Sequence, residues 1–484
     1  MNIRQKLFLT LVVVGNVLLW VIPSNVVELV ARDRHTLLGR YSKEHFNWIV
    51  GVLLISVIGL YIDQARSKET YKRRWFQVLA TLAFLVPTLA AADFLLRVPE
   101  TSHYVKDSLA YHRPPNAAYT EIIEDRPQAR RTYPNAPSGR PPIHCTLHTD
   151  ARGFRNQTAL EQYDVVVLGD SFAEGSSVSD EHPWPVRFAE LAGLSVYNLG
   201  MSGYAPVNYL ASLKEYGLAL EPRYVVCMIY EGNDFRSTRK VLEEQRPQRD
   251  QRIKHYFKQS PILSRLENLF VDTFGPIGAD RDADLLEVLS WLPLRIPDGP
   301  DGNYYAFAPK QLLQSYRSRE MFDYSRHWAS VSATLGDLSR ACREAGAQLI
   351  VYFAPTKAHV TLPIVFDSLP PEKVHAFATL RSDELPDPAT FMSTLGEFLQ
   401  TKELALQEWC AEESVPFATA TNALRQAAAQ GDQVYFTYDQ HWTPEGHDTV
   451  AAAVADALAE PLTAAVQNLP TANSPKSDDN ATSP

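Results

Sequence analysis

A serine, a histidine and an aspartate in this sequence are of the types that together perform nucleophilic catalysis. Ser171 follows Gly169 and Asp170 directly after an apolar run, while Asp439 and His441 lie near the C-terminus with one residue between them. A serine hydroxyl is a weak nucleophile until a base removes its proton, and the pKa of histidine suits that task at neutral pH. An acid bonded to the other ring nitrogen fixes the tautomer. The sequence therefore predicts a serine activated by His441, with Asp439 as the orienting acid.

Two further motifs supply hydrogen-bond donors of the kind that stabilise a negatively charged oxygen. Gly203 ends the segment Asn-Leu-Gly-Met-Ser-Gly, and Asn233 lies in Glu-Gly-Asn-Asp, each soon after an apolar run. Such donors suit the oxyanion of a tetrahedral intermediate, at about 2.7–4 kcal/mol each. We therefore expect an oxyanion hole made by the N–H groups of Ser171 and Gly203 and the Asn233 side chain. Asp170 and Asp234 are assigned supporting positions.

Each motif also has an ordinary structural explanation. Asp and Ser before a helix are common N-cap residues, the glycine segment could be a tight turn, and Asn233 could cap a helix. Asp439 could merely cap its own loop, while Asp448 in the final helix, or a backbone carbonyl, orients His441. The occurrence of all these motifs in one order favours the catalytic interpretation.

Residues so far apart in the sequence need a fold that gathers loops, and the hydrophobic pattern predicts one. From residue 163 onward, apolar runs alternate with helical segments, which is typical of a parallel sheet with helices on both faces. The predicted fold class is α/β, a flavodoxin-like three-layer domain with a central parallel sheet. The expected strands are 165–168, 194–199, 224–230 and 348–353, and the expected helices are 184–192, 207–216, 321–345 and one that begins at Pro444. Catalytic groups gather outside the carboxyl ends of such strands.

The sequence divides into four parts. Residues 1–98 are expected to form a membrane anchor, 99–160 an extended lead-in rich in Pro, Arg and Tyr, 161–462 the α/β domain, and 463–484 a polar, disordered tail. Two insertions, near 235–320 and 361–400, interrupt the alternation of strands and helices. Long segments on the loop side of a sheet often form the walls of a substrate site.

Three apolar stretches, 7–22, 46–62 and 76–96, predict three transmembrane helices. The loop between the second and third carries a cluster of Lys and Arg residues between positions 66 and 74, which marks it as cytoplasmic under the positive-inside rule. With the N-terminus inside and an odd number of spans, everything after residue 96 lies outside the cytoplasm. We therefore expect a multi-pass membrane protein whose catalytic domain is extracytoplasmic, either periplasmic or extracellular.

The composition excludes several other classes of protein. The net charge of −10 argues against nucleic acid as a partner, because phosphate contacts need clustered Lys and Arg. Four cysteines are too few and too scattered for a disulfide scaffold or a CxxC metal site, although an oxidising compartment would allow a Cys342–Cys410 bridge. His144, Cys145 and His148 lack a fourth ligand nearby, so no metal site is predicted. The serine mechanism requires no organic cofactor.

The order Gly-Asp-Ser, Gly, Gly-Asn-Asp and Asp/His resembles the SGNH (GDSL-type) hydrolase superfamily over about residues 160–460. The resemblance implies Ser171 as nucleophile, His441 as general base and Asp439 as its partner, with the same oxyanion hole. Most members have two residues between the Asp and the His, whereas this chain has one. The Asp-x-His-Trp ending and the Tyr-Phe-Ala-Pro-Thr-Lys stretch at 352–357 are similar to the alginate O-acetyltransferase-like branch, in which the Asp-x-His precedes the serine.

Three functions are compatible with these motifs. The leading hypothesis is a membrane-anchored serine esterase that cleaves acyl esters, such as O-acetyl groups on cell-envelope or exported glycans, through an acyl-Ser171 intermediate. The first alternative is a polysaccharide O-acetyltransferase with the same residues, for which a membrane acyl-donor protein would be a partner. The second is an inactive scaffold or binding domain. The expected partners are an acylated small-molecule or glycan substrate and the membrane, and access of water to the site separates hydrolase from transferase.

Overall fold

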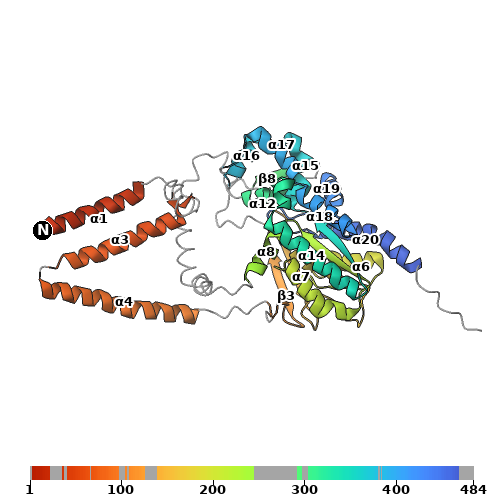
Figure 1. Ribbon diagram of the computed structural model, residues 1–484, viewed down its shortest axis with the longest axis horizontal. Helices are drawn as coiled ribbons and strands as arrows, with labels where there is room; N and C mark the ends of the chain where they lie inside the picture. The colour runs from red at the N-terminus through yellow and green to blue at the C-terminus, as the bar shows by residue number, and fades with distance from the viewer. Residues whose placement is uncertain are drawn as a thin grey trace, which may run out of the picture. The chain divides into compact units, whose positions relative to one another are not determined.

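The computed structural model describes residues 3–21, 35–37, 41–65, 67–96, 104–105, 108–125, 139–157, 159–244, 292–296, 303–379, 382 and 384–467. The chain divides into two compact units, drawn in Figure 1. The N-terminal unit comprises Met1–His103, Ala129–Ala136 and Arg246–Leu289, and the C-terminal unit comprises Tyr104–Gln128, Pro137–Gln245 and Ser290–Pro484. The middle of the first insertion, 245–291, and the predicted tail from 468 onward lie outside the described residues.

The described part of the N-terminal unit consists of long helices and a short strand pair. These elements are α1 (Ile3–Val21), β1 (His35–Leu37), β2 (Tyr41–Ser42), α3 (Lys43–Asp63) and α4 (Lys68–Leu96). Helix α3 contacts both α1 and α4. Asn16 Nδ2 donates to Ser56 Oγ (3.1 Å) between α1 and α3, and Tyr61 Oη donates to Gln77 Oε1 (2.7 Å) between α3 and α4. Polar bonds of this kind commonly join helices in an apolar environment.

The surfaces of these helices carry large apolar side chains, of which Ile55 is 71% and Phe84 75% exposed. Within the described residues, Lys68–Asp93 is long and apolar enough to cross a membrane, while the apolar parts of α1 and α3, Val12–Val21 and Trp48–Asp63, are shorter. Of the three predicted spans, one therefore meets the length that a span requires. The arrangement with three spans stays a prediction.

The C-terminal unit is built on a parallel sheet of five strands in the order β11-β10-β7-β5-β6. The strands are β5 (Val165–Leu168), β6 (Val196–Asn198), β7 (Tyr224–Tyr230), β10 (Gln348–Ala354) and β11 (Phe417–Thr419). Numbered along the chain from one to five, their spatial order is 2-1-3-4-5, which is the flavodoxin-like order. The order reverses between β5 and β7, so the carboxyl ends of these two strands form the switch point at which such folds bind ligands.

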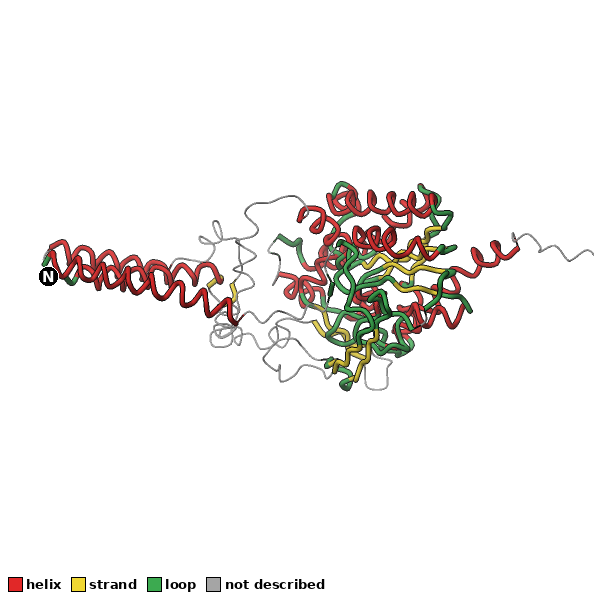
Figure 2. The backbone as a smooth tube through the Cα atoms, turned by 90° about the horizontal axis from the view of Figure 1, so that it is seen from below, coloured by secondary structure: helices red, strands yellow, loops and turns green. Residues whose placement is uncertain are grey.

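Helices cover both faces of this sheet, as the strands drawn between helices in Figure 2 show. On one face, α14 (Arg326–Glu344) packs on β10 and contacts α7 (Pro206–Ser212) and α8 (Asp234–Glu244). On the other, α6 (Trp184–Ala192) and α20 (Pro444–Gln467) contact each other, and they reach β6 and β11 respectively. Because both faces are covered, β5 and β7 are buried at every position. This is the three-layer α/β arrangement that the sequence predicts.

Alternate side chains of the strands fill the two halves of the core. On the α6 face, Tyr352 of β10 meets Trp184 with ring centroids 5.9 Å apart. On the α14 face, Cys342 and Cys410 lie in one hydrophobic cluster with residues of β5, β7 and β10. Both are free thiols, and burial raises the pKa of each to about 12. In this structure they serve as small apolar core residues.

Shorter elements surround the sheet. Two antiparallel hairpins pair β3 (Ala118–Ile123) with β4 (Ile143–His148), and β8 (Leu292–Ile296) with β9 (Asn303–Phe307). The remaining elements are α5 (Ser171–Glu174), η1 (Leu213–Gly217), η2 (Leu218–Leu220), α12 (Pro309–Gln314), α13 (Arg319–Asp323), α15 (Lys357–Val365), η4 (Phe366–Ser368), α16 (Pro371–Thr379), α17 (Pro388–Phe398), α18 (Thr401–Glu412) and α19 (Thr421–Ala429).

Several bounds differ from the predicted ones. The predicted helix 207–216 is α7 followed by the π-helical turn η1, and the predicted helix 321–345 is broken between α13 and α14. The break arises because the Ser325 hydroxyl accepts from the Trp328 N–H and begins α14 afresh. The lead-in contains the strands β3 and β4, and α20 continues to Gln467, past the predicted start of the tail. The second insertion contains the helices α16 and α17.

Candidate active site

Ser171 is the first residue of the short helix α5, directly beyond strand β5. Gly169 makes the turn between them possible, because a Cβ there would lie 2.6 Å from the Ala173 Cβ. Asp170 is the N-cap, and its Oδ1 accepts from the Phe172 N–H (3.0 Å). The capping explanation therefore holds for Asp170, whereas the Ser171 hydroxyl is available for another partner. The turn presents that hydroxyl at the carboxyl edge of the sheet.

His441 links Ser171 to Asp439. His441 Nε2 lies 2.8 Å from Ser171 Oγ, and His441 Nδ1 lies 2.5 Å from Asp439 Oδ1. The same carboxylate oxygen also accepts from the backbone N–H of His441 (2.8 Å). The spacing of one residue between Asp439 and His441 is therefore sufficient. Both the imidazole ring and the backbone N–H of His441 bind the Asp439 carboxylate. The side chains of His441 and Asp439 remain 24% and 31% exposed, so water reaches this pair.

The alternative acid and the metal candidates are engaged elsewhere. Asp448 lies on α20, where its Oδ1 accepts from Arg187 Nε (2.7 Å) and its side chain is half exposed. His148 pairs with Asp180 at 2.6 Å. Across the part of the chain that the structure describes, no three His, Cys, Asp or Glu side chains group as metal ligands would. Asp439 is therefore the acid that the structure places against His441.

The lead-in holds the loop that carries Asp439 and His441, a contact that the sequence did not reveal. Asp125, which is buried, accepts from the backbone N–H groups of Thr437 and Tyr438, both at 2.8 Å. These residues immediately precede Asp439. A carboxylate that satisfies two consecutive N–H groups fixes the backbone direction of the loop, much as a helix cap does. The lead-in thus contributes to the geometry of the acid and the base.

The other end of the same loop is closed by the start of α20. The Phe436 N–H donates to His441 O and the Thr443 N–H to Val434 O, both at 3.2 Å. The Thr443 hydroxyl caps α20 by accepting from the Gly446 N–H (3.1 Å), as the sequence predicts for a helix that begins at Pro444. Gly446 is required here, because a Cβ would lie 2.0 Å from Val434 O. His441 is thus fixed from both sides.

The charges around the pair lower the pKa of Asp439 and raise that of His441. Burial alone would raise the pKa of Asp439, but His441 outweighs it and holds that pKa well below its usual value. Burial alone would lower the pKa of His441, but Asp439, with Asp170 and Glu174, raises it above its usual value. The imidazolium that forms when His441 takes the serine proton is therefore stabilised.

Lys357, from the Tyr-Phe-Ala-Pro-Thr-Lys stretch, is a fully buried amine at the same loop. Its Nζ donates to Thr437 O (2.9 Å) and to Ala306 O (3.2 Å), which lies on β9. Burial lowers the pKa of Lys357 to about 7, although Asp439 and Asp125 oppose the shift. Its positive form in turn helps to keep Asp439 ionised. Sequence similarity had singled out this stretch, but the role of the amine became visible only in the structure.

The three predicted oxyanion donors follow three neighbouring strands. Gly203 follows β6, Ser171 follows β5 and Asn233 follows β7. Gly203 has a φ of +82°, which a glycine adopts without strain. Among the described residues, the backbone N–H groups of Ser171 and Gly203 find no protein acceptor. The Asn233 carboxamide lies beside Asp170 with its Oδ1 buried and unpartnered. These donors thus share one sheet edge with the Ser171 hydroxyl.

The two supporting acids, Asp170 and Asp234, are fully buried. Asp234 accepts from Tyr209 Oη (2.9 Å) and from the Tyr230 N–H (2.7 Å), and these bonds tie the turn that contains Asn233 to β7 and α7. Burial raises the pKa of Asp170 to about 6, and burial together with the charge of Asp170 raises that of Asp234 well above its usual range. The two buried carboxyl groups therefore each disfavour ionisation of the other.

Replacing Asp439 by Asn should affect both the rate and its pH dependence. Since His441 must be neutral to act as base, kcat/KM of the wild type rises with pH through the raised pKa of His441. Without the carboxylate, that pKa falls, so the acidic limb moves to lower pH, and kcat/KM drops by up to about 10⁴-fold.

The measurement is the pH profile of kcat/KM for an activated acetyl ester. Asp448→Asn is the matched control, which should leave both rate and profile unchanged because Asp448 binds Arg187. An equal loss in the control, or an acidic limb that does not move in Asp439→Asn, would contradict the pairing.

One family model matches the part of the chain that carries two of the site residues. Residues 396–479, which include Asp439 and His441, match the family model described as SGNH hydrolase-like domain, acetyltransferase AlgX. Among curated proteins none matches the chain.

Solved structures similar to this chain include a lipolytic protein of the G-D-S-L family from Desulfitobacterium hafniense, with 11% identity, a TM-score of 0.30 and coverage of 61% of this chain and 98% of the other. A variant of Axe2, an acetyl-xylooligosaccharide esterase from a Geobacillus, has 12% identity and a TM-score of 0.29. The match covers 62% of this chain and 96% of the esterase. Residues 396–479 are thus similar to an SGNH hydrolase-like domain, and together with the Ser171–His441–Asp439 arrangement this match supports an ester-acting enzyme, a hydrolase or an O-acyltransferase.

Proposed function

We propose that this protein is a serine esterase that removes acyl groups, O-acetyl groups first among them, from cell-envelope or exported glycans. The observation that carries the proposal is the unbroken chain from Ser171 Oγ through His441 to the Asp439 carboxylate. The glycan is inferred from the family match to an acetyltransferase of the AlgX type.

In the first half-reaction, His441 Nε2 takes the proton of the Ser171 hydroxyl as its oxygen attacks the ester carbonyl. The carbonyl oxygen becomes an oxyanion, which the N–H groups of Ser171 and Gly203 and the Asn233 amide stabilise. The imidazolium then gives its proton to the leaving alcohol, and the acyl group stays on Ser171. Asp439 keeps the imidazole in the tautomer that this transfer needs.

In the second half-reaction, His441 takes a proton from water, which attacks the acyl-Ser171 carbonyl. Collapse of the second tetrahedral intermediate releases the acid and returns the proton to Ser171 Oγ. The partial exposure of His441 and Asp439 supports water as the acceptor, because a transferase has to keep water away from its acyl-enzyme.

A second candidate is an O-acetyltransferase that uses the same residues. The family match favours it, because the model is described by an acetyltransferase. A sugar hydroxyl would then replace water in the second half-reaction, and a membrane acyl-donor protein would be the partner. An inactive scaffold is disfavoured, because a domain without catalysis has no need to keep Ser171, His441 and Asp439 within bonding distance.

Two measurements test the proposed activity. A covalent probe tests the nucleophile, and an added oligosaccharide tests whether water or a sugar accepts the acetyl group. A fluorophosphonate should label Ser171 in the wild type and nothing in Ser171→Ala, since it reacts with activated serines. With an acetyl ester as donor, an esterase releases acetate at a rate that an added oligosaccharide does not reduce, whereas a transferase delivers acetyl groups to the sugar. Labelling that persists in Ser171→Ala would refute the assignment of the nucleophile.

We also propose that the N-terminal unit anchors the enzyme in a membrane with the catalytic domain outside the cytoplasm. Support comes from the span-length apolar stretch Lys68–Asp93 and the exposed apolar side chains of α1, α3 and α4. The basic residues between α3 and α4 favour a cytoplasmic position for that connection.

The topology can be measured with an alkaline phosphatase reporter, which folds only outside the cytoplasm. Fused after residue 97, it should be active, and fused between α3 and α4 it should be inactive. Activity with the opposite pattern would overturn the orientation, and activity at both places would show that α4 does not cross the membrane.

A further inference from the structure

The peptide group between Ser202 and Gly203 carries one of the predicted oxyanion donors, the Gly203 N–H. This peptide lies in the oxyanion loop, residues 199–205, which connects β6 to α7. A trans peptide is planar, so its C=O and N–H point in opposite directions. Whatever fixes the direction of the Ser202 carbonyl therefore also fixes the direction of the Gly203 N–H.

The lead-in fixes that carbonyl. Tyr111 Oη donates to Ser202 O at 3.2 Å. The Tyr111 ring is itself held in place, because it packs edge-on against Tyr204 at 4.7 Å and because Tyr204 Oη donates to the Tyr111 carbonyl. A Cβ on Gly203 would lie 3.1 Å from Tyr111 Oη. The Tyr111 hydroxyl therefore lies in close contact with this peptide.

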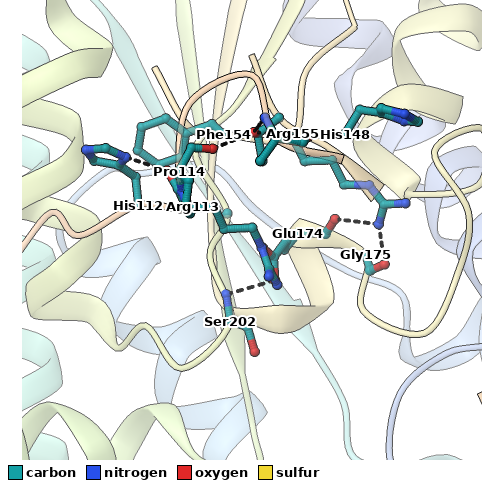
Figure 3. Close-up of polar contacts among 12 residues, drawn as sticks. His112, Arg113, Pro114, His148, Phe154, Arg155, Glu174, Gly175 and Ser202 are labelled. Carbon is teal, nitrogen blue, oxygen red and sulfur yellow. Dashed lines mark hydrogen bonds and ion pairs between the residues drawn. The ribbon is translucent and has the colours of Figure 1, made fainter. Parts of the chain in front are cut away.

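The backbone N–H of Ser202 itself is fixed by Glu174, an acid three residues after the nucleophile. Glu174 ends α5, the helix that Ser171 begins, and is fully buried. Its Oε2 accepts from the Ser202 N–H (3.1 Å), and its Oε1 accepts from Arg113 Nε (2.6 Å). Figure 3 draws Arg113, Glu174 and Ser202 converging in this way. The Arg113 side chain is 13% exposed, so the ion pair is largely shielded from water.

We propose that Tyr111 and Glu174 are positioning residues for catalysis, which aim the Gly203 N–H at the oxyanion by holding both sides of Ser202. The lead-in, which supplies Tyr111 and Arg113, thereby completes the active site instead of merely connecting two units. This inference rests on the proposed function, since it assigns the Gly203 N–H to the oxyanion hole. Neither residue touches the reacting atoms, and both act through the Ser202–Gly203 peptide.

The test uses Tyr111→Phe in the full-length protein, which keeps the ring and removes only the hydroxyl. Because the Gly203 N–H is then no longer held in the direction of the oxyanion, kcat should fall by about 10- to 100-fold while KM stays within about twofold. Inhibition by methylboronic acid, which forms a tetrahedral anion on an activated serine, should weaken in parallel. Inhibition by planar acetate should not change.

Tyr197→Phe is the matched control, because Tyr197 Oη also donates to the lead-in, at Asp150 Oδ2 (2.6 Å), but does not contact the Ser202–Gly203 peptide. It should leave kcat within about twofold of the wild type. An equal fall in both variants, an unchanged kcat in Tyr111→Phe, or a pure rise in KM would overturn the positioning role while Ser171-dependent turnover persists. Turnover that survives Ser171→Ala would instead refute the proposed function, and this inference with it.

Discussion

The hydrogen bond between Ser171 Oγ and His441 Nε2 joins residues that are 270 positions apart in the chain, and the site depends on it. Neither partner can secure this distance by itself. Ser171 is fixed by β5, an inner strand of the sheet, and by the turn at Gly169, whereas His441 lies on a loop outside the strands of that sheet. The loop is therefore held by separate hydrogen bonds, which come from the Asp125 carboxylate, the Lys357 amine and the cap of α20. Catalysis requires that these contacts together place His441 to within a fraction of an ångström of its position against Ser171.

Several ionisable groups at this edge of the sheet are buried, which is costly unless each is paired or hydrogen-bonded. Glu174 is paired with Arg113, Asp170 and Asp234 each accept a hydrogen bond from a backbone N–H group, and Lys357 donates to two carbonyl oxygens. Of the groups at the site, Asp439, Asp170 and Glu174 raise the pKa of His441 and so favour its imidazolium form. The groups that position the site therefore also tune it, and this explains why so many buried charges gather at one edge of the sheet.

The sequence predicted those parts of the structure that depend on the pattern of neighbouring residues. Strand β7 and helix α6 have the predicted bounds, because an apolar β-branched run and an amphipathic period each identify one element. Motif order likewise predicted that Ser171, Asp439 and His441 meet. Strand β11, with its three half-buried residues, and the hairpins of the lead-in and first insertion carried no such pattern. Asp125 and Tyr111 could not be found from sequence, since each acts on a backbone group far along the chain, and backbone groups leave no residue signature.

The central claim is that Ser171 carries the acyl group between the two half-reactions. The most direct measurement is to mix the full-length enzyme with an activated acetyl ester, quench with acid during the first turnover, and locate the acetyl group by mass spectrometry of the peptides. The account predicts an acetyl group on Ser171 that forms before the steady state and is absent in Ser171→Ala. Turnover without acetylated Ser171, or an acetyl group on another residue that persists in Ser171→Ala, would contradict it.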